Sequence, residues 1–402
     1  MEIGLERLPS MPDLVRRLHG ARVGLLTHPA AVRADLVHAA DALRASGVSP
    51  ALLFGPEHGY GGEAQDMIGV AGAVDPRSGA PIVSLYGDSF DDLSPRAEHL
   101  SAIDVLVVDL ADVGARYYTF VWTALLALRA AARAGVHVVL LDRPNPISGA
   151  VASIEGRTQE TGFLSFVGLE PVPVRHAMTV GEVLAHFAER DQLPLGDSGA
   201  LRVVGVRGWD RDQGARAWDR PFVMPSPNMP TETTALVYPG GCLLEGTNLS
   251  EGRGTTRPFE IVGAPWIDGH RLASDLGALA LPGFIARPIT FRPTFQKHAA
   301  TICGGVQIHP TDERTFLPYA TYLALCALAR RQSPERFAFR TERYEYVDII
   351  PAFDLLTGSA TARLAIERGE DPRGIAEAAS RPDPDWADRV EHARRLVEAN
   401  DH

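Results

Sequence analysis

The sequence predicts an α/β fold: a Rossmann-like, doubly wound, mostly parallel sheet, followed by a second, smaller α+β domain. In the first half of the chain, short apolar runs alternate with amphipathic helical stretches. The apolar runs are rich in Val, Leu and Ile and lack polar alternation, as in strands that helices cover on both faces. A length of 402 residues suits two domains, and prolines and glycines interrupt the alternation beyond about residue 220.

The expected strands are short and are bounded by Gly, Pro or Asp. They span residues 22–27, 51–54, 81–85, 104–109, 137–141 and 201–206. Between them we expect helices over residues 32–46, 94–100, 120–134 and 180–190. The last helix has a clear start, because Thr179 is a good capping residue and Glu182 completes a capping box.

Residues 221–265 are rich in Pro and Gly and have few helical signals. Such a long loop is uncommon in a compact fold unless it serves a site or a domain junction. Beyond it we expect a strand at residues 299–308, a helix at 319–331 and a closing helix at 384–399. We therefore place the Rossmann-like domain at residues 1–225 and the smaller domain at 226–402.

Composition narrows the choice of partners. Lys and Arg number 39 against 50 Asp and Glu, a formal net charge of −11. Such a surface repels nucleic acid and anionic membranes, so neither is an expected partner. No signal peptide or membrane-length apolar stretch is present in the sequence, and we expect a cytoplasmic protein. Cys242, Cys303 and Cys326 are too scattered for a disulfide framework, and we expect buried, reduced thiols.

Polar, turn-forming residues follow nearly every expected strand of the first half. Ligands of open parallel sheets bind beyond the carboxyl ends of the strands. The polar segments are residues 27–28, 56–59, 86–88, 109–116 and 142–146. Strand ends are where polar residues belong in any fold, but five chemically diverse segments at one edge favour a binding site.

Glu57 is the candidate acid within these segments. It stands between a strand end and Gly59, where a carboxyl can face a pocket while partly desolvated. A desolvated carboxyl holds its proton more tightly, as a general acid at neutral pH requires. His58 is suited to orient a substrate hydroxyl. The alternatives are a surface salt bridge for Glu57 and a packed, backbone-bonded histidine for His58.

Asp112 and Arg116 lie four residues apart, so on one turn of helix they would pair with each other. The functional alternative has Asp112 as a second carboxylate and Arg116 as a clamp for an anion. Tyr117, Tyr118 and Phe120 follow, and an aromatic face beside polar groups suits the apolar face of a sugar. Aromatic residues are also common in cores.

Arg253 lies between two glycines, which leave space for a ligand to approach closely. Its guanidinium could bind a carboxylate bidentately with help from Thr255, although a tight turn explains the same pattern. Glu245 and Asn228 lie in the same loop-rich passage, and Asn145 follows the fifth strand. We expect these three to contact a substrate.

Two other patterns carry less weight. Residues 59–64 match GxGxxA, but neither a convincing apolar helix nor a suitably spaced acidic residue follows. His28, His58 and His176 with Asp109 suggest a metal site, but no HExxH or HxH spacing supports it. We expect neither a metal nor an organic cofactor.

The ordered motifs resemble the exo-β-N-acetylmuramidase family, formerly a domain of unknown function, whose members trim peptidoglycan fragments. They are GPEHGYGGEAQD, SLYGD, DVLVVDLADVGARYYTF, LLDRPNPISG, SFVGLEPVPVRHAMTVGE, MPSPNMPTETTALVYPGG, EGTNLSEGRGTTRPFE and GGVQIHPTD, and they run from about residue 24 to 312. The resemblance implies a Rossmann-like catalytic domain, a smaller C-terminal domain and an active site in the cleft between them. It also implies that the catalytic glutamate is Glu57.

The implied reaction releases a terminal, non-reducing N-acetylmuramic acid from a β-1,4-linked muropeptide or disaccharide. That sugar carries a lactyl carboxylate, which Arg116 and Arg253 are our candidates to hold. Two carboxyls normally flank the scissile bond; we expect Asp112, or else Glu245, to be the second. Asn145, Asn228 and Tyr118 are the expected positioning groups.

Three departures from the family pattern bear on fine substrate preference. Leu110-Ala111 stands where the family usually has a Gln, His28 where an Asn is usual, and Ala177 where a Gly commonly follows Arg-His. Two rival functions stay open: a non-catalytic muropeptide- or sugar-binding protein, and a metal-dependent amide or ester hydrolase.

Overall fold

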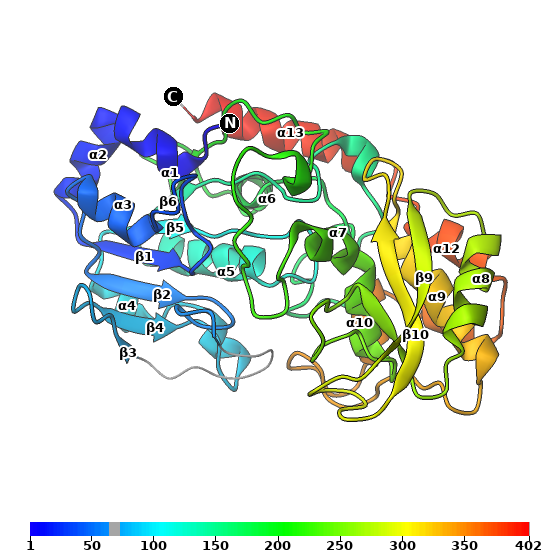
Figure 1. Cartoon of the computed structure of the whole chain (residues 1–402). Helices are drawn as coiled ribbons and strands as arrows, with labels where there is room; N and C mark the ends of the chain where they lie inside the picture. The colour runs from blue at the N-terminus through cyan, green and yellow to red at the C-terminus, as the bar shows by residue number, and fades with distance from the viewer. Residues whose placement is uncertain (64–72, 402) are drawn as a thin grey trace.

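The computed structural model describes residues 1–63 and 73–401. The end of the GPEHGYGGEAQD motif and of the GxGxxA match, from Ala64 on, lies outside the described residues. The chain forms two lobes, one built on each of two sheets (Figure 1).

The larger sheet has seven strands in the order β3-β4-β2-β1-β5-β6-β7. The strands are β1 (Val23–Thr27), β2 (Leu52–Gly55), β3 (Ala73–Val74), β4 (Pro81–Ser84), β5 (Val105–Asp109), β6 (His137–Leu141) and β7 (Leu201–Val204). Every pair is parallel except β3 with β4. All six strands expected in the first half are confirmed. The short β3, whose two residues are exposed, gave no apolar run to detect.

Successive residues of the central strands pack into two different cores. Leu106 and Val108 join the core under α5 (Phe120–Arg133) and α6 (Val180–Arg190). Val107 joins the other core, under α1 (Gly4–Arg7), α2 (Pro12–His19) and α3 (Ala39–Ala45). Because both faces are covered, an unbroken apolar run is the pattern that the strand needs.

The smaller sheet is antiparallel, with strand order β8-β10-β9. Its strands are β8 (Ile261–Ala264), β9 (Phe284–Phe291) and β10 (Cys303–Pro310). The helices of this lobe are α7 (Glu232–Gly241), α8 (Gly269–Ala278), α9 (Pro318–Gln332), α10 (Ala352–Thr357), α11 (Thr361–Glu367) and α12 (Pro372–Ser380). The expected combination of a doubly wound sheet and a smaller α+β part is therefore confirmed.

Several expected boundaries were wrong. The helix expected at 32–46 is confined to α3, because Val32 and His38 form an isolated bridge across a turn. The helix expected at 94–100 is α4 (Ala97–Ser101). The passage expected to be loop holds α7 and β8. Thr231 caps α7 through its side chain, and the helix is buried from Thr234 to its end, with Pro239 inside it. The capping box of Thr179 and Glu182 on α6 is confirmed.

The last helix returns to the first lobe. Helix α13 (Trp386–Ala399) packs on α6, and Trp386 Nε1 donates to the carbonyl of His176 at 3.0 Å. Arg7 and Asp401 form an ion pair at 2.6 Å, so the two ends of the chain lie together (Figure 1). The domain boundary at residue 225 stays a prediction. The C-terminal helix α13 packs on the first lobe, although it lies in the segment assigned to the smaller domain.

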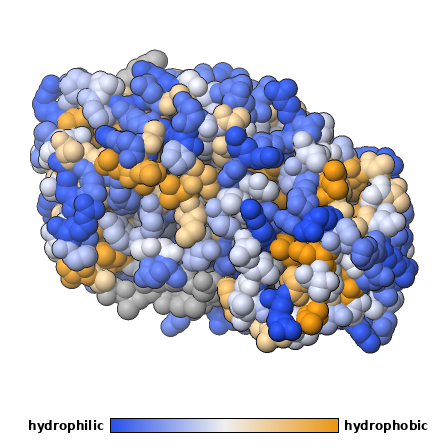
Figure 2. Space-filling view, in the orientation of Figure 1, coloured by the Kyte–Doolittle hydropathy of each residue, from blue (hydrophilic) through white to orange (hydrophobic). Residues whose placement is uncertain are grey.

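The face seen in Figure 2 is mostly hydrophilic, with small apolar patches on both lobes. Within the described residues, no helix is long and apolar enough to cross a membrane. The three cysteines are free and buried, as expected.

Candidate active site

Glu57 sits in a tight turn at the carboxyl end of β2. The amide of Gly59 donates to the carbonyl of Pro56 at 2.9 Å, and His58 between them adopts a φ of +70°. That conformation usually requires glycine or asparagine and strains a histidine by about 1–2 kcal/mol. The turn folds back on Gly55, where a Cβ would lie 2.2 Å from the amide nitrogen of Tyr60. A strained turn held against a strand fixes the direction of the Glu57 side chain.

The Glu57 carboxylate is buried and contacts one residue from each of two elements. Thr119, directly before α5, donates its hydroxyl to Oε2 at 2.5 Å. His58 Nε2 lies 3.9 Å from Oε1. Glu57 is only 7% exposed, so it is not the surface salt-bridge partner considered above.

A narrow pocket surrounds this carboxylate and has walls from both lobes. It brings together six of the nine residues that the sequence singled out: Glu57, His58, Tyr118, Asn228, Glu245 and Arg253. Its other lining residues are Tyr117, Thr119, Val167, Ser226, Met229, Tyr238, Phe259, Tyr344 and Glu345. Residues more than 280 positions apart in the chain therefore meet around Glu57.

Arg253 and Glu245 form the charged wall of the pocket on the side of the smaller lobe. Arg253 Nη2 donates to Glu245 Oε1 at 2.8 Å, and the Tyr344 hydroxyl donates to Oε2 at 2.7 Å. Arg253 is flanked by Gly252 and Gly254, both at φ +78°. A Cβ on either would approach backbone atoms to 2.7 Å or less, so the glycines shape this loop.

Behind this wall, Lys297 Nζ pairs with Glu251 Oε2 at 2.9 Å and helps to keep the pKa of Glu251 below its usual value, against the effect of burial. Thr255 donates its hydroxyl to the carbonyl of Gly252 at 2.5 Å. The Thr255 hydroxyl therefore closes the turn around Arg253. The structure does not show it helping Arg253 to bind a carboxylate, as the sequence suggested.

Sequence reasoning missed Glu345 and Tyr344. Tyr344 and Val347 exchange backbone hydrogen bonds at 3.0 Å, which makes a two-residue hairpin turn. The central residues, Glu345 and Tyr346, have φ values of +44° and +69°. In sequences such a turn is usually recognised by Asn-Gly at its centre. This turn has neither residue there, so its sequence did not predict it.

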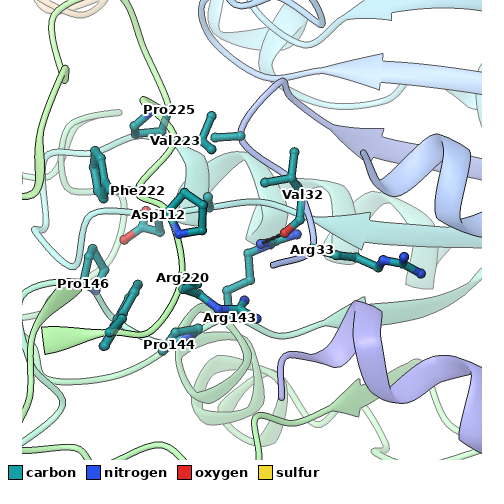
Figure 3. A pocket seen from close by; sticks show the side chains of 14 residues that line it. Val32, Arg33, Asp112, Arg143, Pro144, Pro146, Arg220, Phe222, Val223 and Pro225 are labelled. Atoms are coloured by element: carbon teal, nitrogen blue, oxygen red, sulfur yellow. Dashed lines mark hydrogen bonds between the residues drawn. The ribbon is translucent and has the colours of Figure 1, made fainter. Parts of the chain in front are cut away.

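Asp112 lies in a different pocket at the same edge of the sheet (Figure 3). This second pocket lies beyond the ends of β1 and β5, where the strand order reverses, and the segment from Trp218 to Pro225 covers it. Burial raises the pKa of Asp112 to about 7, although the amide of Gly114 donates to its Oδ2 at 2.7 Å. The structure therefore does not bring Asp112 to Glu57 as the expected second carboxylate.

Arg116 does not reach the Glu57 pocket either. Its guanidinium is fully buried and donates to the carbonyls of Arg157 and Val172, both at 2.8 Å, and of Leu356 at 2.6 Å. Residues 110–119 are not helical, so the expected turn of helix shared with Asp112 is wrong. Its Nη1 and Nη2 therefore join the two lobes, and the structure does not bring Arg116 to Glu57 as the expected anion clamp.

Asn145 is the third residue that lies elsewhere. Its Nδ2 donates to the carbonyl of Met178 at 3.0 Å, and its Oδ1 accepts from the amide of Ile147 at 3.0 Å. Its amide group packs against Gly114, where a Cβ would lie 2.1 Å from Oδ1. Asn145 thus stabilises the loop after β6.

The structure shows the surroundings of the departures from the family pattern. His28 Nε2 accepts a hydrogen bond from the amide of Ala111 at 2.8 Å, so two of the departures contact each other. Ala177 adopts a φ of +60°, the conformation for which glycine is favoured.

The remaining residues considered for a metal site are dispersed. Burial lowers the pKa of His28 to about 3 and that of His176 to about 4, so both are neutral core histidines. Asp109 pairs with Arg143. Across residues 1–63 and 73–401, no group of three or more His, Cys, Asp or Glu side chains is arranged to hold a metal ion.

Comparison with known proteins shows which family this chain matches. Residues 23–233 match the model described as exo-beta-N-acetylmuramidase NamZ, N-terminal, and residues 236–394 match its C-terminal counterpart. The peptidoglycan beta-N-acetylmuramidase NamZ of Bacillus subtilis is 39% identical over 376 residues, which cover 93% of this chain and 86% of that protein.

Two solved structures share the architecture. A DUF1343 family protein from Bacteroides fragilis is 30% identical, with a TM-score of 0.84 and coverage of 99% of this chain and 98% of the other. A second DUF1343 family protein from the same organism is 24% identical, with a TM-score of 0.69 and coverage of 99% and 97%. The second likeness is one of fold alone.

Proposed function

Because the chain belongs to the exo-β-N-acetylmuramidase NamZ family and is a glycoside hydrolase, we propose that it releases terminal N-acetylmuramic acid from the non-reducing end of β-1,4-linked peptidoglycan fragments. The observation that supports this most directly is the pocket between the two lobes, which joins a buried carboxyl, Glu57, to a buried guanidinium, Arg253. A glycosidase of this specificity needs a proton donor for the glycosidic oxygen and a cation for the lactyl carboxylate.

Glu57 is the general acid in this proposal. Thr119 occupies Oε2, which leaves Oε1 as the oxygen suited to carry the proton. The donated proton neutralises the leaving oxygen as its bond to the anomeric carbon breaks. His58, whose ring nitrogen lies 3.9 Å from Oε1, is in place to orient a hydroxyl of the substrate.

Arg253 is the proposed partner of the lactyl carboxylate. Its guanidinium presents several donors in one plane; Nη2 donates to Glu245 at 2.8 Å, and Nε lies 3.9 Å from Glu251 Oε1. The aromatic residues Tyr118 and Tyr238 line the same pocket and offer apolar surface to the sugar ring. Asn228, also in the lining, is a proposed positioning group.

The test compares the wild type with Glu57→Gln on a MurNAc-containing disaccharide and on a chromogenic N-acetylmuramide with an activated leaving group. Removing a general acid lowers kcat by about 10²–10⁴. We expect the larger loss on the disaccharide, because its leaving group depends more on protonation. Glu98→Gln, which changes an exposed carboxyl on α4, is the matched control.

Binding distinguishes the enzyme from a sugar-binding protein. Glu57→Gln keeps the pocket's shape, so calorimetry is expected to show the disaccharide bound as tightly as by the wild type. Wild-type hydrolysis of N-acetylmuramide and N-acetylglucosaminide at equal rates contradicts the role of Arg253. Binding by the wild type without any turnover contradicts the proposed reaction. Loss of turnover on exhaustive chelation, reversed by metal, would favour the metal-dependent hydrolase.

A further inference from the structure

A second catalytic group is required if Glu57 is the acid. Hydrolysis of a glycoside normally uses a second carboxylate on the opposite face of the sugar, either as a base for water or as a nucleophile. Within the described lining of the pocket, the carboxylates other than Glu57 are Glu245 and Glu345. The choice between them rests on the proposed function.

Glu245 belongs to the charged wall. Its Oε1 accepts from Arg253 and its Oε2 from the Tyr344 hydroxyl, so each carboxylate oxygen has a close donor. These contacts tie Glu245 to the residue proposed to hold the lactyl group. Its position is therefore that of a support for Arg253.

Glu345 is presented to the pocket by a strained turn. Both central residues of the Tyr344–Val347 turn have left-handed backbone conformations, which large side chains rarely adopt. Strain of this kind persists where surrounding contacts impose it, and it clusters at active sites. Glu57 stands beside an equally unusual residue, His58, in the turn on the other lobe.

The turn of the smaller lobe docks on the larger lobe beside Glu57. Tyr346 donates its hydroxyl to the carbonyl of Gly87 at 2.9 Å, and Tyr86 donates its hydroxyl to Glu345 Oε2 at 3.4 Å. Burial raises the pKa of Tyr86 above its usual value, and the nearby carboxylates of Glu57 and Glu345 raise it further. The Tyr86 hydroxyl is therefore close enough to Glu57 and Glu345 for both carboxylates to raise its pKa.

We propose that Glu345 is the catalytic carboxylate on the face of the sugar opposite Glu57. In hydrolysis, the bond from the anomeric carbon to the leaving oxygen breaks with its electron pair, and that oxygen takes the proton of Glu57. Water forms the new bond from the opposite face and gives its proton to Glu345. Glu345 then releases this proton to solvent, and solvent returns a proton to Glu57. In a double displacement, Glu345 forms the new bond itself. Water then replaces it, with Glu57 as the base.

The test uses Glu345→Gly and Glu345→Gln in the full chain. Glycine is the residue that a φ of +44° favours, so Glu345→Gly is expected to fold with an unchanged or higher Tm. Its kcat is expected to fall by about 10²–10⁴. The fall should be similar for activated and poor leaving groups, unlike that of Glu57→Gln. Asp348→Asn, an exposed carboxyl three residues on, is the control.

Azide provides a signature that a structural role does not produce. Added azide is expected to restore turnover of a β-configured substrate by Glu345→Gly and to give an α-glycosyl azide. The inference is overturned if both variants hydrolyse the substrate near the wild-type rate, or if azide gives a β-glycosyl azide or no azide product. The wild-type assay separates the two proposals. If the wild type releases N-acetylmuramic acid and only the Glu345 result fails, the proposed function stands without this inference.

Discussion

Thr119 donates a hydrogen bond to Oε2 of Glu57 at 2.5 Å, and both side chains are buried. The two residues are 62 positions apart, on the approach to α5 and at the end of β2. The residue that precedes a helix thereby fixes the carboxyl of a residue that follows a strand.

Thr119→Val keeps the shape of this side chain and removes its hydroxyl. A buried acceptor that loses its donor costs about 1–3 kcal/mol, and 1.4 kcal/mol corresponds to tenfold in rate. We expect kcat/KM on the disaccharide to fall by about tenfold or more. Thr119→Ser, which keeps the hydroxyl, should stay within about threefold of the wild type. Equal rates for the Val and Ser variants would contradict a positioning role for Thr119.

Arg253→Met is expected to affect discrimination between sugars. Loss of a charged hydrogen bond costs about 1.5–3 kcal/mol, so kcat/KM for an N-acetylmuramide should fall by about 10–100-fold. The fall for the matching N-acetylglucosaminide, which lacks the lactyl group, should be smaller. Arg257→Met changes a half-exposed arginine of the same loop and serves as control. An identical fall on both sugars would mean that Arg253 does not recognise the carboxylate.

Asp112→Asn is expected to change the pH dependence of stability. The folded pKa of Asp112, about 7, lies above its ordinary value of 3.8, so the folded state retains a proton that the unfolded state has lost. The stability associated with this group is complete below about pH 4 and is lost as pH rises through 7. The Tm of Asp112→Asn should therefore rise relative to the wild type between pH 5 and pH 8, by at least about 2 °C.

The same variant separates the two pockets functionally. Since Asp112 lies outside the Glu57 pocket, kcat on the disaccharide should stay within about threefold of the wild type. Parallel Tm curves for variant and wild type would contradict the raised pKa, and a loss of activity above 10²-fold would restore Asp112 as a catalytic candidate.

Arg116→Met is expected to lower stability and not to impair the chemistry. It leaves three carbonyls, two of them buried and one partly buried, without their donor, at a cost of about 3 kcal/mol. Calorimetry should show a Tm lower by about 5 °C or more. Arg157→Met, whose side chain is exposed, should leave the Tm unchanged. A stable Arg116→Met protein that has lost its preference for N-acetylmuramide would contradict a structural role.

Much of the first lobe was predictable because its signals are local. Each buried parallel strand needs one apolar run with a turn residue at its end, and six such runs were enough to place six strands. Glu57 followed from its place behind the second of them. The second lobe was harder, because α7 contains Pro239 and β8 is a short strand inside the passage rich in Pro and Gly.

The sequence by itself determined the parallel sheet, the position of Glu57 at its edge and, through the order of its motifs, the family. It did not separate Arg116 from Arg253, since each lies within two residues of a glycine in a polar segment. Tertiary structure decided that Arg116 is buried among three carbonyls and that Arg253 lines the same pocket as Glu57. It also brought Glu345 across from the other lobe. The physical reason is that strand and turn preferences act between near neighbours in the chain, whereas the pocket depends on how two lobes pack, which no local pattern records.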